Sequence, residues 1–148
     1  MGIAGAIAVS RARASVFTQS LFDEQWDAER VAGFVNERRN ATIATVSSAG
    51  QPHAAVVIAA SVGGEIYFTV NPSSVLARNL ATNDRIALSV CDSVHAVMSQ
   101  GRAERVGAAP DLAPLVESIA EATAAGRFTP DGWDGDIYRA DIGRLVAN

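Results

Sequence analysis

The sequence predicts a mainly β fold of the α+β class, a small closed or half-closed barrel of six antiparallel strands with flanking helices. Six short runs rich in apolar and β-branched residues follow one another between residues 42 and 146, mostly joined by hairpin-length turns. Helical patterns are confined to the beginning of the chain and the longer connections, unlike the regular strand–helix alternation of a parallel sheet. Residues 54–60 have only apolar side chains, which is typical of a strand covered on both faces.

The composition indicates one compact domain and excludes several classes of function. Of the 148 residues, 49% are hydrophobic and 19% are charged, as expected of a globular chain. A net charge of −4 without a basic stripe argues against nucleic acid as a partner. All 12 basic residues are arginine, which excludes lysine Schiff-base chemistry and a lysine phosphate clamp. A single cysteine, no secretory signal and no membrane-spanning run predict a cytoplasmic protein without membrane contact.

The first half of the chain is expected to contain an arm, a helix and three strands. Residues 1–22 show no clear period and are predicted to be a flexible or partly helical arm before a barrel domain over residues 23–148. Residues 23–39 have apolar side chains at helical spacing, with acidic residues early and arginines late, which predicts an amphipathic helix. Strands are expected at residues 42–47, 53–60 and 66–70, the last two joined by Gly63 and Gly64.

The second half is expected to add two helices and three strands. These are a helix over residues 73–82, strands at 86–91 and 96–106, a helix from Pro110 to residue 125, and a strand at 137–146. Cys91 ends an apolar strand, so it is expected to be a core residue rather than a nucleophile. His95 has no ligand partner at metal-binding spacing, and no metal site is expected.

The junction between the third strand and the next helix has the features of an anion site. Ser73 and Ser74 begin the helix, where unpaired amides and the helix dipole favour negative charge. Arg78 lies one turn after Ser74 on the same face and could contact the same phosphate. An ordinary capped helix between two strands explains the same residues, and both interpretations stay open.

An ordered series of short segments resembles the pyridoxamine-phosphate-oxidase-like split-barrel family. The segments are ATIATV at 41–46, GQPH at 50–53, GEIYF at 64–68, ARNL at 77–80, DRIALS at 84–89 and GRAE at 101–104. The resemblance is closest to the short bacterial members that use FMN or the deazaflavin coenzyme F-420. It implies a six-stranded split barrel that forms a homodimer, with two cofactor sites built from both chains. We expect the dimer to form through the second strand and the fifth and sixth strands.

The resemblance also implies positions for the cofactor. The phosphate is expected near the strand–helix junction, and the ring along the second strand, with two residues of the partner chain closing the pocket. The residues at the junction are Asn71, Ser73, Ser74, Leu76, Ala77, Arg78 and Asn79; those along the ring are His53, Ala54, Ala55, Val56 and Thr69; those that close the pocket are Trp133 and Tyr138. His53 is either a partner of a ring carbonyl or a proton relay, or a strand-edge histidine bonded to backbone.

Leu76 departs from the family pattern. Members that hold a flavin phosphate usually have a lysine at this position, and leucine cannot neutralise phosphate. Leu76→Lys is therefore expected to tighten FMN or deazaflavin binding, unless Leu76 packs into a closed core. Arg78 is then the remaining cation of the helix, and its loss is expected to weaken binding.

The resemblance implies an oxidoreductase that transfers hydride to or from a small unsaturated or aromatic substrate. No residue is assigned as catalytic, because a flavin or deazaflavin carries the hydride chemistry and the protein positions it. Two alternatives stay open. One is a split barrel that binds a cofactor, haem or tetrapyrrole without turnover, as a carrier or sensor. The other is a cofactor-free structural member of the family.

Overall fold

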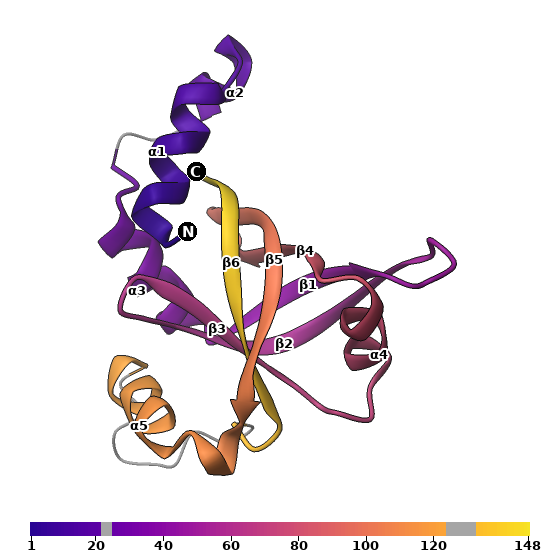
Figure 1. The fold of residues 1–148 in the computed structure, drawn as a ribbon. Helices are drawn as coiled ribbons and strands as arrows, with labels where there is room; N and C mark the ends of the chain where they lie inside the picture. Colours follow the sequence, from indigo (N-terminus) through magenta and orange to yellow (C-terminus); the bar gives the residue numbers. More distant parts are fainter. Residues whose placement is uncertain (22–24, 124–132) are drawn as a thin grey trace.

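Six antiparallel strands close into one barrel in the computed structural model, which describes residues 1–21, 25–123 and 133–148 (Figure 1). The order around the barrel is β1-β2-β3-β6-β5-β4. The strands are β1 (Asn40–Val46), β2 (Pro52–Val62), β3 (Glu65–Val70), β4 (Arg85–Cys91), β5 (Ala96–Ala108) and β6 (Asp136–Ala147). The predicted fold class is confirmed. In this order β2 neighbours β1 and β3, so it is adjacent to neither β5 nor β6 within one chain.

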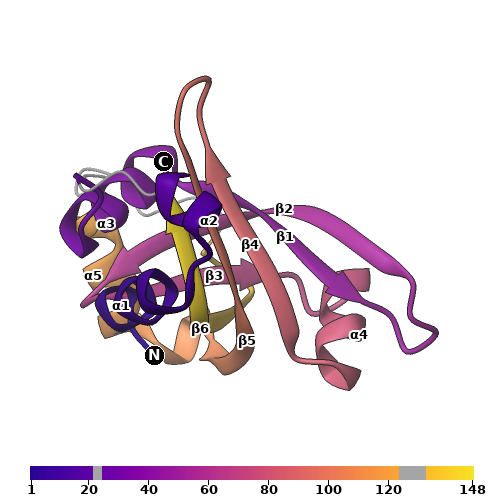
Figure 2. The same ribbon diagram turned by 90° about the horizontal axis from the view of Figure 1, so that it is seen from above.

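The helices lie outside the barrel wall or across its ends (Figure 2). They are α1 (Ile3–Arg13), α2 (Val16–Leu21), α3 (Ala28–Arg38), α4 (Val75–Thr82) and α5 (Ala113–Ala122), with a 3-10 turn at Ala109–Asp111. Asp27 caps α3 by accepting a hydrogen bond from the Arg30 amide at 2.8 Å. The first predicted helix is expected to start at residue 23, and the helix from Pro110 to end at residue 125. Both of these positions lie outside the described residues. No helix among the described residues is long and apolar enough to cross a membrane.

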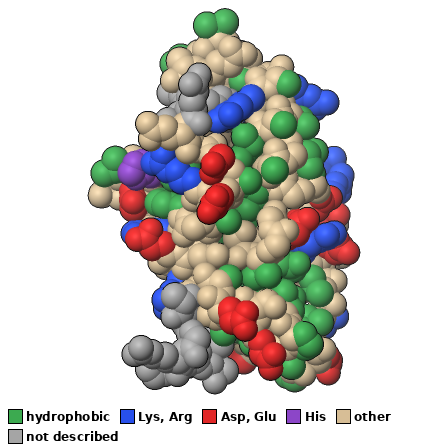
Figure 3. Space-filling model, turned by 90° about the vertical axis from the view of Figure 1, so that its left-hand side faces the viewer, with side chains coloured by type: hydrophobic (Ala, Val, Ile, Leu, Met, Phe, Trp, Pro, Cys, Tyr) green, Lys and Arg blue, Asp and Glu red, His purple; other side chains and the backbone are tan. Residues whose placement is uncertain are grey.

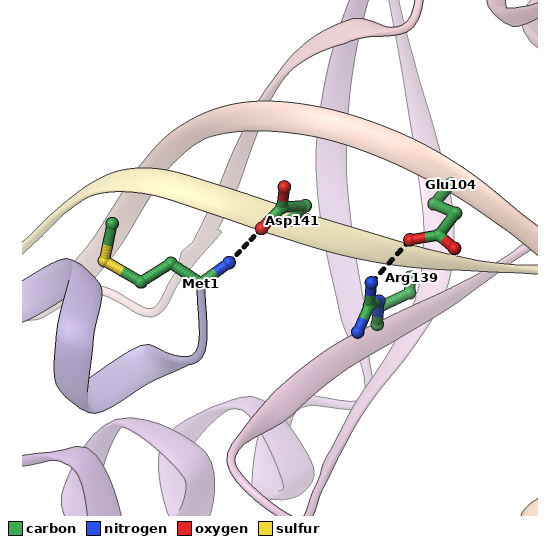
Figure 4. A network of polar contacts seen from close by, with 4 residues as sticks. All are labelled: Met1, Glu104, Arg139 and Asp141. Atoms are coloured by element: carbon green, nitrogen blue, oxygen red, sulfur yellow. Dashed lines mark hydrogen bonds and ion pairs between the residues drawn. The ribbon is translucent and has the colours of Figure 1, made fainter.

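The beginning of the chain packs closely on the barrel. Residues 3–13 form α1, and Ile3 and Ala6 on its inner face are fully buried. The hydroxyl of Ser10, itself 5% exposed, accepts a hydrogen bond from the Leu145 amide of β6 at 2.7 Å. At the other end of α1 the amino group of Met1 contacts the Asp141 carboxylate (Figure 4), which lowers the pKa of Asp141 below its usual value. A helix anchored at both ends therefore runs along β6.

The barrel core follows the alternation of side chains along each strand. Inward residues such as Ile43, Phe68 and Leu88 are fully buried, and their neighbours face outward. Cys91 is one of the outward residues, so the prediction of a core cysteine is wrong. It follows the buried Val90 by one position, and the period of two places it on the opposite face. A hydrophobic run alone does not reveal which face a terminal residue takes.

Only half of β2 is covered on its outer face. At its C-terminal half Ala60 is buried in a second hydrophobic cluster with Ile119 of α5 and with Ile137. At its N-terminal half Ala54 is exposed and Val56 is 74% exposed. The expectation of a strand covered on both faces thus holds in this chain for one half of β2. Figure 3 shows the face of the molecule on the side of α1 and α3, where acidic and basic side chains are interspersed with apolar ones.

Candidate functional site

The junction between β3 and α4 is a well-formed helix cap. The hydroxyl of Ser74 accepts from the Ala77 amide at 3.1 Å and donates to the Asn71 carbonyl oxygen at 2.7 Å. The Asn71 side chain accepts from the Ser73 amide at 2.9 Å. The Ser74 hydroxyl is therefore used within the turn, whereas the first-turn amides of Val75 and Leu76 have no acceptor inside the helix. A small anion could be held by these amides.

The two faces of α4 differ in their surroundings. Arg78 is exposed, and its guanidinium has no hydrogen bond or ion pair within the described part of the chain. Leu76 lies on the opposite side, is 4% exposed and belongs to the main hydrophobic core. A lysine at position 76 would therefore place its ammonium group in the core and not beside Arg78. This burial removes the reason to expect a gain of affinity from Leu76→Lys.

A buried polar contact ties α4 to the end of β1. The Asn79 side-chain amide donates to the Thr45 hydroxyl at 3.1 Å, and both side chains are buried. Thr45 is the strand partner of His53, so these side chains lie on the same inward face. The Nδ1 atom of His53 is buried and has no hydrogen-bond partner. Asn79 thus holds α4 against β1. His53 is the strand neighbour of Thr45, the residue that Asn79 contacts.

The four candidate ring-binding residues of β2 lie on two faces. His53 and Ala55 point inward and are half-buried, whereas Ala54 and Val56 point outward and are exposed. A flat ring lying on the outside of the strand would contact Ala54 and Val56. The family resemblance implies that all four lie along the ring, and the alternation of side chains along a strand divides them between its two faces.

Thr69 and Asn71 share a cavity of about 310 Å³ with a carboxylate. The cavity is also lined by Asp134 and Gly135, which precede β6. A Cβ at position 135 would lie 2.6 Å from the Val70 carbonyl oxygen, so this close approach of two backbones requires glycine. Asp134 would repel a phosphate placed in this cavity. Sequence reasoning did not predict that the segment before β6 reaches Thr69.

Trp133 and Tyr138 have different surroundings. Trp133 is 6% exposed and packs within its own chain in the cluster under α5, so little of its ring is available to a partner. Tyr138 is half-buried and stacks on Phe68, with ring centroids 5.7 Å apart. Burial, and then the charge of Asp136, raise the pKa of the Tyr138 phenol above its usual value. Tyr138 therefore stays neutral to a higher pH than an exposed tyrosine.

Tyr138 provides a test of this environment. The folded chain retains the phenol proton to a higher pH than the unfolded chain, so this contribution to stability is complete below the unfolded value, near pH 10, and is lost as the pH rises further. Absorbance titration of phenolate formation is expected to show a late component that is absent in Tyr138→Phe. A component lost in Tyr138→Phe that titrates no later than the remaining tyrosine would contradict the burial of Tyr138.

Two hollows lie on the outer face of the sheet. Two adjoining cavities of about 830 and 520 Å³ cover β1, β4, β5 and β6. The strand register extends this face to β2, because Thr42 pairs with Val56 and Ala44 with Ala54. The outward side chains around the centre are small or apolar with few charges: Thr42, Ala44, Ala87, Ser89, Met98, Gln100, Arg144 and Val146. We call this surface the outer groove. The sequence indicates this surface by small residues at alternate positions, Thr42 and Ala44 of β1 and Ala87 and Ser89 of β4.

Comparison with known proteins places this barrel in a family. Residues 28–138, which include five of the strands and the first part of β6, match the family Pyridoxamine 5'-phosphate oxidase. The chain belongs to this family. The match confirms the resemblance found in the ordered segments of the sequence. A comparison with curated proteins found no match.

Solved structures of the same fold have varied descriptions. The protein Atu2129 of unknown function from Agrobacterium tumefaciens str. C58 is 26% identical with a TM-score of 0.61, and the match covers 84% of this chain and 57% of that protein. A heme binding protein from Mycobacterium smegmatis is 22% identical, with 85% and 59% covered and a TM-score of 0.55. An F420 reductase is 20% identical, with 76% and 92% covered and a TM-score of 0.59. The last two likenesses establish the fold alone.

Proposed function

We propose that this chain is a cytoplasmic oxidoreductase that uses FMN or the deazaflavin coenzyme F-420. Its reaction would transfer hydride to or from a small unsaturated or aromatic substrate. Membership of the family and the F420 reductase of the same fold support this proposal. The observation that carries it is the exposed apolar end of β2, whose strand partner β1 contacts α4, a helix whose first-turn amides and Arg78 are available to a phosphate.

The residues fit such a group in its main features. Ala54 and Val56 would support a flat ring, since small side chains let the ring approach the strand. The amides of Val75 and Leu76, together with Arg78, would hold the phosphate. The bound cofactor would supply the hydride chemistry, and the protein would orient it and exclude water. Asn79 would act indirectly, by holding α4 against Thr45.

A second copy of the chain is part of the proposal. The centre of the outer groove, over β1, β4, β5 and β6, has mainly small or apolar side chains, and a single copy leaves it open. A symmetric dimer would cover the same surface on both chains, and the exposed end of β2 would become an inner wall. The cofactor would then lie between two chains, where water is excluded.

Arg78→Ala tests the phosphate site. The loss of a charge-assisted hydrogen bond is expected to weaken FMN or F-420 binding by about 1.5–3 kcal/mol, equivalent to about ten-fold or more. Stability should change by no more than about 0.5 kcal/mol, because Arg78 is exposed. Fluorescence titrations at two salt concentrations measure the affinity, with Arg139→Ala as a charge-matched control. Equal affinities in all three proteins would contradict the phosphate site.

The alternative is a carrier or sensor of haem or another tetrapyrrole. It is favoured by the heme binding protein that shares the fold. The visible spectrum of the protein, before and after addition of reduced cofactor and an acceptor, separates the possibilities. Reoxidation of the cofactor supports the enzyme, and a Soret band without turnover supports the carrier. Failure to bind either group would leave the cofactor-free structural member.

A further inference from the structure

Most guanidinium groups of this chain have a partner. Arg102 pairs with Asp84, Arg105 with Asp136 at 2.9 Å, and Arg139 with Glu104 (Figure 4). Within residues 1–21, 25–123 and 133–148, four guanidinium groups have neither a hydrogen bond nor an ion pair: those of Arg13, Arg78, Arg85 and Arg144. Arg13 and Arg144 come from opposite ends of the chain, yet they line the same cavity.

This cavity lies between α1 and β6 and has a volume of about 230 Å³. Its lining is Val9, Ser10, Arg13, Gly143 and Arg144, and it contains no acidic residue. Ser10 accepts from the Leu145 amide, and no described residue accepts the hydrogen of its own hydroxyl. The hydroxyl can therefore donate into the cavity. Two like charges beside one small cavity repel each other, and an anion between them would offset this repulsion.

An irregularity in β6 adds to this arrangement. The register passes from Gln100 paired with Arg144 to Gly101 paired with Ile142, so Gly143 is the extra residue of a β-bulge and has no partner in the ladder. A Cβ at position 143 would meet no atom closer than 3.9 Å, so packing does not require glycine here. Gly143 lines the cavity, and its backbone adds polar atoms to the lining.

The cavity shares lining residues with the outer groove. Arg144 also lines both cavities of the groove, and Gly143 lines the larger one. The C-terminal end of α1 carries about half a negative charge, which two full positive charges outweigh. We propose that Arg13, Arg144 and Ser10 bind the oxyanion of a small organic anion, whose apolar part extends past Gly143 to the edge of the outer groove. The oxyanion can be a phosphate or a carboxylate. This site is separate from the one at α4.

Binding of inorganic phosphate and of phenyl phosphate tests the proposal on the purified full chain without added cofactor. Calorimetric titration is expected to detect both anions and to give a higher affinity for phenyl phosphate, because its ring can enter the groove. Arg13→Gln and Arg144→Gln should each weaken binding of both anions about ten-fold or more. Arg139→Gln, on the same strand as Arg144, removes the same charge outside the cavity and should leave both affinities unchanged. Benzoate and acetate repeat the comparison for a carboxylate.

Several outcomes would overturn the proposal. Absence of phosphate and carboxylate binding by the wild-type protein would reject the site. Equal weakening by Arg139→Gln would show a general charge effect, and undiminished binding by Arg13→Gln and Arg144→Gln would place the anion elsewhere. Equal affinities for phenyl phosphate and inorganic phosphate would reject the role of the groove. Both arginines are exposed, so loss of folding is not expected, and circular dichroism of each variant checks this. None of these outcomes depends on FMN or F-420 binding.

Discussion

Replacing Leu76 by lysine is expected to lower the free energy of unfolding by about 2–5 kcal/mol. Leu76 is 4% exposed and packs in the main core, with Leu80 on the next turn of α4. The substitution removes buried apolar contacts and places an ammonium group where no carboxylate has been found among the described core residues. Partial extension of the lysine chain toward water would reduce this cost and not abolish it. No gain in FMN or F-420 affinity is expected.

Leu76→Met is the matched control for this prediction. It keeps the volume and apolar character of the side chain, so a loss below about 1.5 kcal/mol is expected. Urea unfolding followed by circular dichroism measures both variants, and fluorescence titration with FMN measures affinity. A stable Leu76→Lys protein with tighter FMN binding would show that position 76 faces the phosphate after all. That result would restore the expectation taken from the family pattern.

Ala87→Arg is expected to convert the proposed dimer into a monomer of 15.4 kDa. Ala87 is half-buried at the middle of the outer groove, paired with Ala44 on one side and with Gln100 on the other. A symmetric dimer through this face would bury the new guanidinium without a partner, once from each chain. A cost of about 3 kcal/mol or more would weaken association by more than about a hundred-fold.

Light scattering over a dilution series measures the association. Ala122→Arg carries the same substitution at an exposed position of α5, away from the groove, and should remain dimeric. A wild-type protein that is monomeric at all concentrations would reject the dimer. A dimeric Ala87→Arg variant would place the contact on another surface. Neither outcome decides the oxyanion site, because that site is tested by phosphate binding to other variants, those of Arg13 and Arg144.

The strands and the cap of α4 are features that the sequence predicts by itself. β-branched runs, the glycines at 63 and 64, and the Ser73–Ser74 pair are local signals, since each depends on residues a few positions apart. The ordered segments predict the family for a similar reason, because they occur in the chain in a fixed order and need no knowledge of their contacts. Membership is confirmed over residues 28–138.

The tertiary structure alone decides which residues meet. Leu76 is buried and Arg78 is exposed, although both lie on one short helix, because α4 turns only one face to the barrel. Strand pairing places β1 and β4 between β2 and β5, and so makes one outer groove from segments far apart in the chain. Packing of α1 on β6 brings Arg13 to Arg144. Such contacts depend on long-range register and packing, which no local pattern of residues specifies.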